Sequence, residues 1–329
     1  MPITEKKPCA LIFGVSGQDG AYLCRLLLDK GYQVHGTSRD AETTSFVNLE
    51  TLGVRHRVTI HSATPADIQS VEKAIELTSP TEIYNLLGPS SVAMSFEKPK
   101  ETIEVITLGS LNILKAILAA DVSIRYYNAA TSECFGDTGD SPADEQTPFN
   151  PQSPYAAAKA EAFYKTAKYR EDFGLFACSG IFFNHESPLR PELFVTGKII
   201  RGAARIAAEG SGVLHLGNLD IRRDWGWAPE YVDAMWRMLQ QNRPGDFVIA
   251  TGKSHSLKDL AAAAFSHFNL DWRDHVKSDP SLFRPTDIIT SAGDPSKALR
   301  ILKWRAETQM KDVVRLMAEA ESGSHAGRQ

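Results

Sequence analysis

Along the first 183 residues, short apolar runs alternate with segments whose apolar positions recur with the period of a helix. Short apolar runs predict buried strands at 10–13, 33–38, 58–61, 82–87, 125–130 and 177–183. Amphipathic segments lie between them, and one at 21–30 carries three leucines on one helical face. Strands that alternate with helices at this spacing form right-handed βαβ units and a parallel sheet. We therefore predict an α/β fold with a doubly wound parallel sheet.

This rhythm breaks after residue 183. Pro188 and Pro191 interrupt the chain, and the pattern then predicts a helix at 198–209 and one more buried strand at 247–250. Met310, Val313 and Met317 mark a last amphipathic helix. The expected division is a first domain of 1–183 plus 227–252, a smaller C-terminal α/β lobe of 184–226 plus 253–321, and a disordered tail at 322–329.

Composition narrows the class of protein. The chain has 329 residues, 43% of them hydrophobic and 23% charged, which is typical of a globular protein. Its net charge of −4 argues against nucleic acid or an acidic membrane surface as a partner. The four cysteines are scattered, so we expect reduced thiols and no metal site. The polar N-terminus lacks a signal-like segment and no apolar run approaches a membrane span of about 18 residues, so a cytoplasmic location is expected.

A glycine-rich turn directly follows the first predicted strand and opens the first helix. Such a turn lets the backbone approach a pyrophosphate, while the helix N-terminus offers free N–H groups. The spacing is GxxGxxG, and the context makes the first domain a dinucleotide-binding domain. The predicted cofactor-binding residues of this turn are Gly14, Ser16, Gly17, Gln18, Asp19 and Gly20.

Two residues at the end of the second strand bear on the choice of cofactor. Arg39 can pair with the 2′-phosphate of NADP, whereas Asp40 suits the free 2′-hydroxyl of NAD. Because the two lie side by side, the residues alone leave NADP and NAD both open.

The candidate catalytic residues follow the fifth strand. Tyr155 and Lys159 are four residues apart and so project from one helical face. An ammonium beside a phenol lowers the phenol pKa from about 10 toward neutrality. The tyrosine can then take a hydroxyl proton as hydride leaves the same carbon. Thr131 or Ser132 can bond that oxygen, and Glu133 can remove a second proton next to the new ketone.

These residues lie within longer motifs that resemble the GDP-mannose 4,6-dehydratase family, part of the extended short-chain dehydrogenase/reductase superfamily. The resemblance covers nearly the whole chain. Its motifs are GQDG at 17–20, TSE at 131–133, SPY at 153–155 with Lys159, NHESP at 184–188, RDWG at 223–226, IATG at 249–252 and FRP at 283–285.

The resemblance implies a reaction with bound NADP or NAD. Tyr155 would take the C4 hydroxyl proton as hydride passes to the cofactor, with Thr131 bonding that oxygen. Glu133 would then remove the C5 proton, water would leave from C6, and hydride would return to C6. The product would be a 4-keto-6-deoxy sugar.

The resemblance also implies binding roles. Tyr155, Lys159, His185 and Arg190 would line the cofactor, and NADP is the cofactor that the family favours. The positions that would surround the GDP-sugar are Ser90, Ser132, Asn184, Val195, Lys198, Arg223 and Arg284. Arg223 has an alternative role in an ion pair with Asp224. Relatives pair the helices at 102–120 and after Pro154, which implies a homodimer. A tetramer stays open because the loop at 40–48 diverges.

Several positions depart from the family pattern, mostly around the cofactor. They are Phe13-Gly14, Arg39-Asp40, Thr64-Pro65, Leu87-Gly88-Pro89-Ser90 and Gly197, which stands where an arginine is usual. The alternatives to a GDP-mannose dehydratase are a nucleotide-sugar epimerase or reductase, a non-catalytic nucleotide-sugar-binding paralogue, and a nucleotide-sensing regulator. The intact Glu133 argues against a reductase or a pure binding protein, and the intact Tyr155 and Lys159 argue against a sensor.

Overall fold

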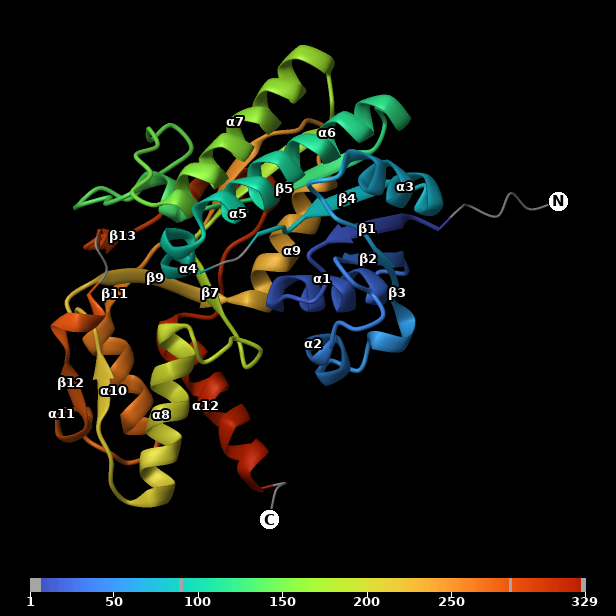
Figure 1. Ribbon diagram of the computed structural model, residues 1–329. Coiled ribbons are helices and arrows are strands. Elements are labelled where there is room, and N and C mark those ends of the chain that lie inside the picture. Colours follow the sequence, from blue (N-terminus) through green and yellow to red (C-terminus); the bar gives the residue numbers. More distant parts are fainter. Residues whose placement is uncertain (1–6, 89–90, 284–285, 327–329) are drawn as a thin grey trace. The chain divides into compact units, whose positions relative to one another are not determined.

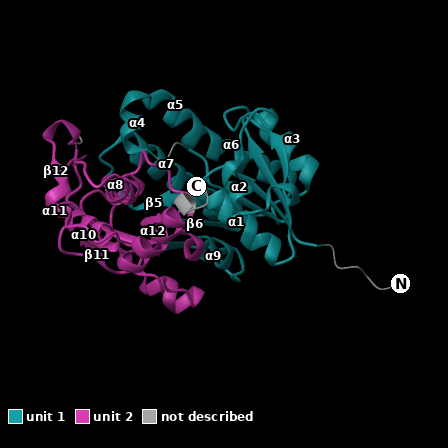
Figure 2. Cartoon of the chain, turned by 90° about the horizontal axis from the view of Figure 1, so that it is seen from below, with its two compact units in different colours: residues 1–134, 151–181, 232–247 teal, residues 135–150, 182–231, 248–329 magenta. Residues whose placement is uncertain are grey.

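The computed structural model describes residues 7–88, 91–283 and 286–326. The chain divides into two compact units, coloured separately in Figure 2. Unit 1 consists of residues 1–134, 151–181 and 232–247, and unit 2 of residues 135–150, 182–231 and 248–329. The division runs through strands β6 and β10 and helix α9, so these elements have residues in both units.

Unit 1 contains the parallel sheet and its covering helices (Figure 1). The strands of this sheet are β1 Cys9–Phe13, β2 Gln33–Ser38, β3 Thr59–Ser62, β4 Glu82–Asn85, β5 Arg125–Thr131, β6 Ala177–Phe182 and β10 Asp246–Ile249. The helices are α1 Gln18–Asp29, α2 Val47–Thr51, α3 Ile68–Thr78, α4 Val92–Glu97, α5 Pro99–Ile103, α6 Gly109–Ala120, α7 Pro154–Phe173 and α9 Ala228–Leu239.

The order of the seven strands is β10-β6-β5-β4-β1-β2-β3. The chain winds outward from β1 to β3 and then returns to the other side of β1 with β4, so the topology switches between β1 and β4. In such sheets, ligands bind beyond the carboxyl ends of the strands at this switch point. The doubly wound parallel fold that the sequence predicts is confirmed.

Apolar side chains on both faces of the strands explain why this sheet is buried. Leu11 and Phe13 of β1 pack in one cluster with Val71 of α3 and Ile113 of α6. Ala10 and Ile12, which alternate with them, are also fully buried. Central parallel strands covered on both faces require such continuous apolar runs.

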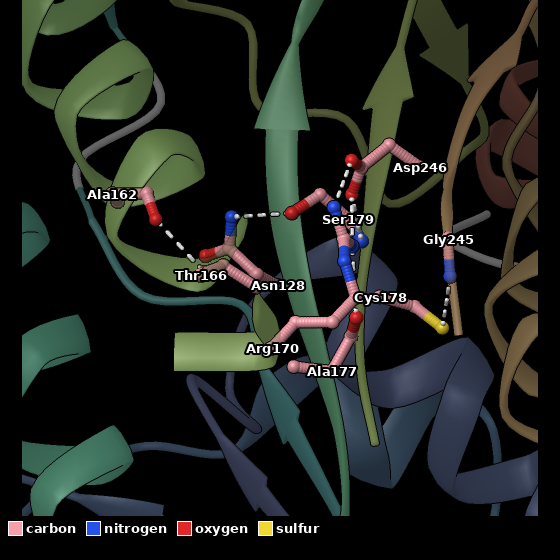
Figure 3. Close-up of polar contacts among 9 residues, drawn as sticks. All are labelled: Asn128, Ala162, Thr166, Arg170, Ala177, Cys178, Ser179, Gly245 and Asp246. Carbon is pink, nitrogen blue, oxygen red and sulfur yellow. Dashed lines mark hydrogen bonds and ion pairs between the residues drawn. The ribbon is translucent and has the colours of Figure 1, made fainter. Parts of the chain in front are cut away.

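A polar network ties the far end of α7 to the sheet (Figure 3). The guanidinium of Arg170 binds both carboxylate oxygens of Asp246, at 2.9 and 2.6 Å, and also donates to the carbonyl of Ala177. Asp246 accepts the backbone N–H of Ser179, whose hydroxyl accepts from Asn128. Bidentate Arg–carboxylate bonds fix geometry as well as charge, so this network holds α7 in register with β5 and β6.

Unit 2 is built from short strands and three longer helices. Its elements are β7 Asn184–Glu186, α8 Val195–Glu209, β8 Leu214–Leu216, β9 Arg222–Trp227, β11 Ser254–Ser256, α10 Leu257–His267, α11 Trp272–His275, β12 Val276–Ser278, β13 Thr290–Ser291 and α12 Met310–Ala326. Strand β9 lies between β11 and β13 and also pairs with β7. Helices α8, α10 and α12 enclose the core of this unit, which includes Ile199, Phe265 and Val314.

The structure corrects several expected boundaries. Residues 182–183, 227–231 and 248–252, expected in the dinucleotide-binding domain, lie in unit 2. The segment 135–150, expected in the dinucleotide-binding domain, lies in unit 2, because Ala143 bridges Gly293 and Thr138 bonds Thr290. The tail expected to be disordered from residue 322 continues α12 as far as Ala326, and 327–329 lie outside the described residues.

One helical stretch also corrects the expectation about membrane spans. Pro99–Ala120, which comprises α5, the π-helical turn Glu104–Leu108 and α6, is long and apolar enough to cross a membrane by length and composition alone. Of its apolar window, 44% is buried inside the protein. Charged residues interrupt its first turns, so the sequence has no unbroken apolar run there.

Candidate active site

The glycine-rich turn joins β1 to α1 and has no room for side chains at two of its glycines. Gly14 has φ +90°, and a Cβ there would lie 2.8 Å from the carbonyl oxygen of Leu86. A Cβ on Gly20 would lie 2.5 Å from the carbonyl oxygen of Gly14. The N-cap of α1 is Gly17, which supplies no side-chain oxygen to the first N–H groups of the helix. These N–H groups therefore suit an anionic ligand.

The other predicted residues of the turn lie in the same place. Asp19 and Gln18 open α1, and the amide of Gln18 donates to Asp19 at 3.1 Å. The side chain of Ser16 is exposed, and its carbonyl accepts from Asn48 of α2 at 2.9 Å. Gly36 of β2 belongs to this arrangement although sequence reasoning missed it: a Cβ there would lie 2.5 Å from the side chain of Val15. Its signal was a glycine inside a strand.

Arg39 and Asp40 follow β2 but differ in their contacts. The carboxylate of Asp40 bonds the backbone N–H groups of Glu42 and Thr43 and the hydroxyl of Thr43. The hydroxyl bond of Thr43 is the largest influence that lowers the Asp40 pKa. The guanidinium of Arg39 is exposed and lies 3.7 Å from Glu101, an ion pair open to solvent that contributes little.

The four predicted catalytic residues all lie in unit 1. Thr131 ends β5, and Glu133 lies in the 3-10 turn Ser132–Phe135 that follows directly. The backbone N–H of Glu133 donates to the Thr131 hydroxyl at 3.3 Å. Tyr155 and Lys159 lie in the first turns of α7, which begins sharply because the Ser153 hydroxyl caps the N–H of Ala156 and Pro154 opens the helix. Ser132 is buried and Glu133 is half-buried.

Lys159 is a buried ammonium held by neutral oxygens. Its Nζ donates to the carbonyls of Leu87 and Ala129, both at 2.9 Å, and the residue is 7% exposed. Burial lowers the pKa of Lys159 to about 8, against smaller opposite effects of Cys134 and Asp19. A lysine with this pKa is charged at neutral pH and close to titration, as proton-transfer sites require.

Asn85 is a buried residue beneath the site that sequence reasoning missed. Its side-chain oxygen accepts the N–H of Leu87, whose carbonyl binds Lys159. Its amide donates to the hydroxyls of Ser110 and Tyr126, both at 2.8 Å. Asn85 therefore fixes the backbone that holds the lysine. An asparagine at the end of a buried strand was the available signal.

Two segments that depart from the family pattern, at Pro65 and at Gly88, pack against neighbouring helices. The carbonyls of Pro65 and Ala66 both accept from Asn112 of α6. A Cβ on Gly88, which has φ +117°, would lie 2.5 Å from Ile106. These loops are therefore packed against the helices that cover them. Ser90, predicted to bind substrate, lies outside the described residues, as does Arg284.

In unit 2, Arg223 and Asp224 hold backbone segments together. Arg223 is 6% exposed, and its guanidinium donates to the carbonyls of Ile288 at 2.8 Å and Arg222 at 2.9 Å. The fully buried carboxylate of Asp224 accepts the consecutive N–H groups of 251–253, at 2.9 to 3.1 Å. Burial raises the Asp224 pKa to about 6. The predicted substrate role of Arg223 thus competes with a structural one, in which its guanidinium binds backbone carbonyls.

The remaining predicted residues of unit 2 gather around β7 and the start of α8. Asn184 and His185 belong to β7, and Val195 is the first residue of α8. The partly exposed Lys198, one turn into α8, donates to the carbonyl of His215 at 2.7 Å. Arg190 forms an ion pair at 3.0 Å with the buried Glu186 and lies over the ring of Phe194.

Gly197, one of the departures named from the sequence, lies against the side chain of Arg201. The Arg201 guanidinium donates to the carbonyl of Arg190 and would lie 3.0 Å from a Cβ on Gly197. A Cβ would also lie 2.8 Å from the carbonyl of Pro191. An arginine one turn later in α8 therefore reaches the loop beside Gly197. Among the residues that the structure describes, no group of three or more His, Cys, Asp or Glu side chains could hold a metal ion.

Known proteins match the chain over almost its full length. The family model described as GDP-mannose 4,6 dehydratase matches residues 11–317. "GDP-mannose 4,6 dehydratase 1" of Arabidopsis thaliana is 42% identical, covering 97% of this chain and 91% of that protein. The GDP-mannose 4,6-dehydratase of Sinorhizobium fredii (strain HH103) is 43% identical, covering 94% and 95%.

A solved structure has the same fold. The UDP-glucose 4-epimerase of Thermus thermophilus, in complex with NAD, superposes with a TM-score of 0.84 at 25% identity, covering 96% of this chain and 99% of the epimerase. The family model and the curated relatives decide the closer relationship, because they match nearly the whole chain at about 40% identity. The chain belongs to the GDP-mannose 4,6-dehydratase family.

Proposed function

We propose that this protein converts GDP-mannose, or a close GDP-sugar, to the GDP-4-keto-6-deoxy sugar. The observation that carries the proposal is the position of Glu133. It follows Thr131 by two residues, in the same unit as Tyr155 and the buried Lys159. An alcohol oxidation needs only the hydroxyl, the tyrosine and the lysine, so a half-buried carboxylate at this place adds the base that an elimination requires.

The residues of the glycine-rich turn fit a dinucleotide. A side chain at Gly14 or Gly20 would collide with backbone oxygens, and the first N–H groups of α1 lack a side-chain cap. A bound nicotinamide would supply the acceptor and later the donor of a hydride. The curated relatives and the NAD complex of the structural relative support such a cofactor.

The chain's own residues would divide the proton transfers. Tyr155 takes the proton of the C4 hydroxyl, and the Lys159 ammonium lowers the energy of the resulting phenolate. Thr131 holds the same sugar oxygen by its hydroxyl. Glu133 removes the C5 proton, which the C4 ketone acidifies, and the C6 hydroxyl leaves as water after protonation. Solvent then supplies the proton that C5 regains.

We propose NADP as the preferred cofactor, on the basis of the residues after β2. Each carboxylate oxygen of Asp40 is engaged within its own turn, whereas the Arg39 guanidinium is exposed and its pairing with Glu101 is weak. Titration with NADP⁺ and NAD⁺ tests this proposal. We expect Arg39→Ala to weaken NADP⁺ binding roughly tenfold and to leave NAD⁺ unchanged, whereas Asp40→Ala changes the NADP⁺ to NAD⁺ ratio less than twofold. Equal Kd values for both cofactors in the wild type would contradict it.

We also propose a homodimer formed by the helices around α5 and α7. The exposed apolar side chains there are Met94, Phe96, Ile103, Leu108 and Tyr164. Burial of such a patch stabilises association. Light scattering should give a dimer for the wild type and a monomer for Ile103→Asp. A wild-type monomer at micromolar concentration would contradict the proposal.

A cytoplasmic location remains our proposal, and fractionation of expressing cells tests it.

The direct test of the activity is incubation of the purified protein with GDP-mannose and NADP⁺. We expect a product that has lost one water and carries a 4-ketone, with no net consumption of cofactor. Inversion of a sugar hydroxyl without loss of mass would instead indicate an epimerase. Binding of GDP-mannose without any turnover at any substrate concentration would indicate a non-catalytic paralogue.

A further inference from the structure

The long helical stretch formed by α5 and α6 in unit 1 contains one widened turn, Glu104–Leu108. The backbone N–H of Gly109 bonds the carbonyl of Glu104, five residues earlier, which is the hydrogen-bond pattern of a π-helix. The hydroxyl of Ser110 donates to the carbonyl of Ile106 at 2.6 Å. A single π turn inside an α-helix is frequently found at a functional site, so the neighbours of this turn bear on the reaction.

The π turn changes which neighbour each apolar side chain meets. In an unbroken α-helix, residues seven positions apart share one face. Ile106 and Ile113 are seven apart, yet Ile113 packs in one cluster with Leu11 of β1 and Val71 of α3, whereas Ile106 packs with residues of α7. The extra residue of the widened turn accounts for this difference, because one residue rotates the helix by about 100°.

Ile106 covers the face of α7 that carries Tyr155. The two helices lie side by side (Figure 1). Tyr155, Ala158 and Ala162 share one face of α7, and among the described residues the buried member of their cluster outside α7 is Ile106. The hydroxyl of the neighbouring Thr107 donates to the carbonyl of Ala158 at 3.3 Å. Ile106 is 1% exposed and Tyr155 8%, so this contact is closed to solvent.

Gly88 leaves space for Ile106 on the side of the loop after β4. Gly88 has φ +117°, and a Cβ there would lie 2.5 Å from Cγ1 and 2.8 Å from Cδ1 of Ile106. The residue before it, Leu87, accepts the Lys159 ammonium through its carbonyl. Ile106 is therefore enclosed between the loop that holds Lys159 and the helical face that carries Tyr155.

The helix that carries Ile106 is itself held close to two loops. A Cβ on Gly109 would lie 2.9 Å from Cβ of Pro65 and 3.2 Å from Cδ1 of Leu87. One turn later, the amide of Asn112 donates to the carbonyl of Pro65 at 2.9 Å. The close approach at Gly109 and this hydrogen bond fix the start of α6, so the backbone beneath Ile106 has a defined position.

We propose that Ile106 is a positioning residue for Tyr155, whose ring it holds in one orientation on the face of α7. The proposal rests on the proposed function in that it takes Tyr155 as the acceptor of the sugar proton. A proton acceptor must lie within hydrogen-bond distance of the hydroxyl that it deprotonates, and a small displacement lowers the rate of the chemical step. In this role Ile106 acts through Tyr155 and contacts neither the sugar nor the cofactor.

The first test is steady-state kinetics of Ile106→Ala with GDP-mannose and NADP⁺. We expect kcat to fall roughly tenfold and KM to stay within about twofold, because a misplaced acceptor weakens the transition state more than the ground state. Ile113→Ala is the matched control, since it removes an equally buried isoleucine of the same helical stretch from the cluster around β1 and α3.

Both alanine variants should lower Tm, because each leaves a cavity, but Ile113→Ala should keep the wild-type kcat. If Ile106→Ala also keeps it, or if both variants lower kcat equally, Ile106 serves packing alone and the proposal is wrong.

A second measurement needs no turnover. In protein with ¹³C-labelled tyrosine rings, the signals of Tyr155 are assigned by their absence from Tyr155→Phe. We expect one sharp set of signals in the wild type and in Ile113→Ala, and a broadened or doubled set in Ile106→Ala. A doubled set in the wild type, or a sharp set in Ile106→Ala, would overturn the proposal. A protein that shows the expected signals but does not dehydrate GDP-mannose would refute the proposed function and leave the positioning role standing.

Ile106→Val and Ile113→Val decide the matter if Ile106→Ala does not fold. Each removes a single methyl group from a buried site, which a core tolerates better than truncation to alanine. The Tyr155 signals should broaden in Ile106→Val and stay sharp in Ile113→Val. Identical signals in the two valine variants would contradict the positioning role.

Discussion

Unit 1 and unit 2 use buried charged side chains for different purposes. In unit 1, the Lys159 ammonium is held by two neutral carbonyls, and its pKa is lowered to about 8. In unit 2, the Asp224 carboxylate and the Arg223 guanidinium are each bonded to backbone groups of distant loops. All three charges are bonded to neutral backbone groups, but the Lys159 ammonium lies one helical turn from Tyr155 and has a pKa close to neutrality, which suits proton-transfer chemistry. The unit 2 charges fasten loops. Substitutions in unit 1 should therefore remove activity first, and those in unit 2 stability or binding first.

The largest effect is expected at Tyr155, which we propose as the catalytic tyrosine. Tyr155→Phe removes the proton acceptor and should lower kcat about 10³-fold, within the range of general acid–base catalysis. Thermal unfolding should change little, because the ring is kept. Tyr164→Phe, on the same helix but 53% exposed, is the matched control and should retain wild-type kcat. A Tyr155→Phe variant with more than a tenth of wild-type activity would contradict the assignment.

The pH dependence of Lys159 gives the next largest effect. The ammonium must be charged to stabilise the phenolate, so kcat/KM should fall about tenfold per pH unit above about 8. The contribution of Lys159 to the free energy of unfolding should instead rise with pH. Between about 8 and the ordinary lysine value of 10.5, the unfolded chain binds the proton that the folded chain has lost, so the contribution of this group to stability rises with pH. Chemical denaturation of wild type and Lys159→Met across this pH window tests this prediction. The contribution of Lys159 should make the free energy of unfolding rise with pH in the wild type relative to the variant.

In unit 2, Asp224→Asn tests whether the carboxylate fastens the 251–253 loop. An amide nitrogen cannot accept the N–H groups that one carboxylate oxygen accepts, so we expect a loss of about 1–3 kcal/mol in the free energy of unfolding. The exposed Asp220, which pairs with Lys258 at 2.5 Å, supplies the control, and Asp220→Asn should cost less than about 0.5 kcal/mol. Equal small losses in both variants would refute the fastening role.

The smallest effect is expected at Lys198. It is partly exposed and donates to the His215 carbonyl, so Lys198→Met should leave stability almost unchanged. If Lys198 binds the diphosphate as we propose, the variant should raise the KM for GDP-mannose a few-fold. Unchanged KM would remove Lys198 from the substrate site.

Local motifs account for what the sequence could predict. The glycine turn, the pair Tyr155 and Lys159, and the segment 131–133 each lie within one strand–turn or one helix, where spacing alone fixes which side chains share a face. The doubly wound parallel sheet followed from the regular alternation of strands with helices. These parts of unit 1 were therefore accessible from the sequence.

Long-range contacts account for most of what the sequence could not show. The segment 135–150 joins unit 2 through contacts with residues some 150 positions away, among them the bridge of Ala143 to Gly293 and the bond of Thr138 to Thr290. Arg223 was expected to face the substrate, yet its bonds to Ile288 and Arg222 depend on how β9 meets the segment before β13. Likewise, the stack of His185 on Tyr231 requires β7 and β9 to be paired. No local pattern encodes such contacts.

The central claim is that Tyr155 with Lys159 performs the oxidation and Glu133 the elimination. A single-turnover reaction of Glu133→Gln with GDP-mannose and NADP⁺, followed by nicotinamide absorbance and by mass spectrometry, tests it most directly. We predict that reduced nicotinamide accumulates while no water is lost, whereas wild type releases water and shows no lasting reduction. Loss of water by Glu133→Gln at the wild-type rate, or a failure of that variant to reduce the nicotinamide at all, would contradict the account.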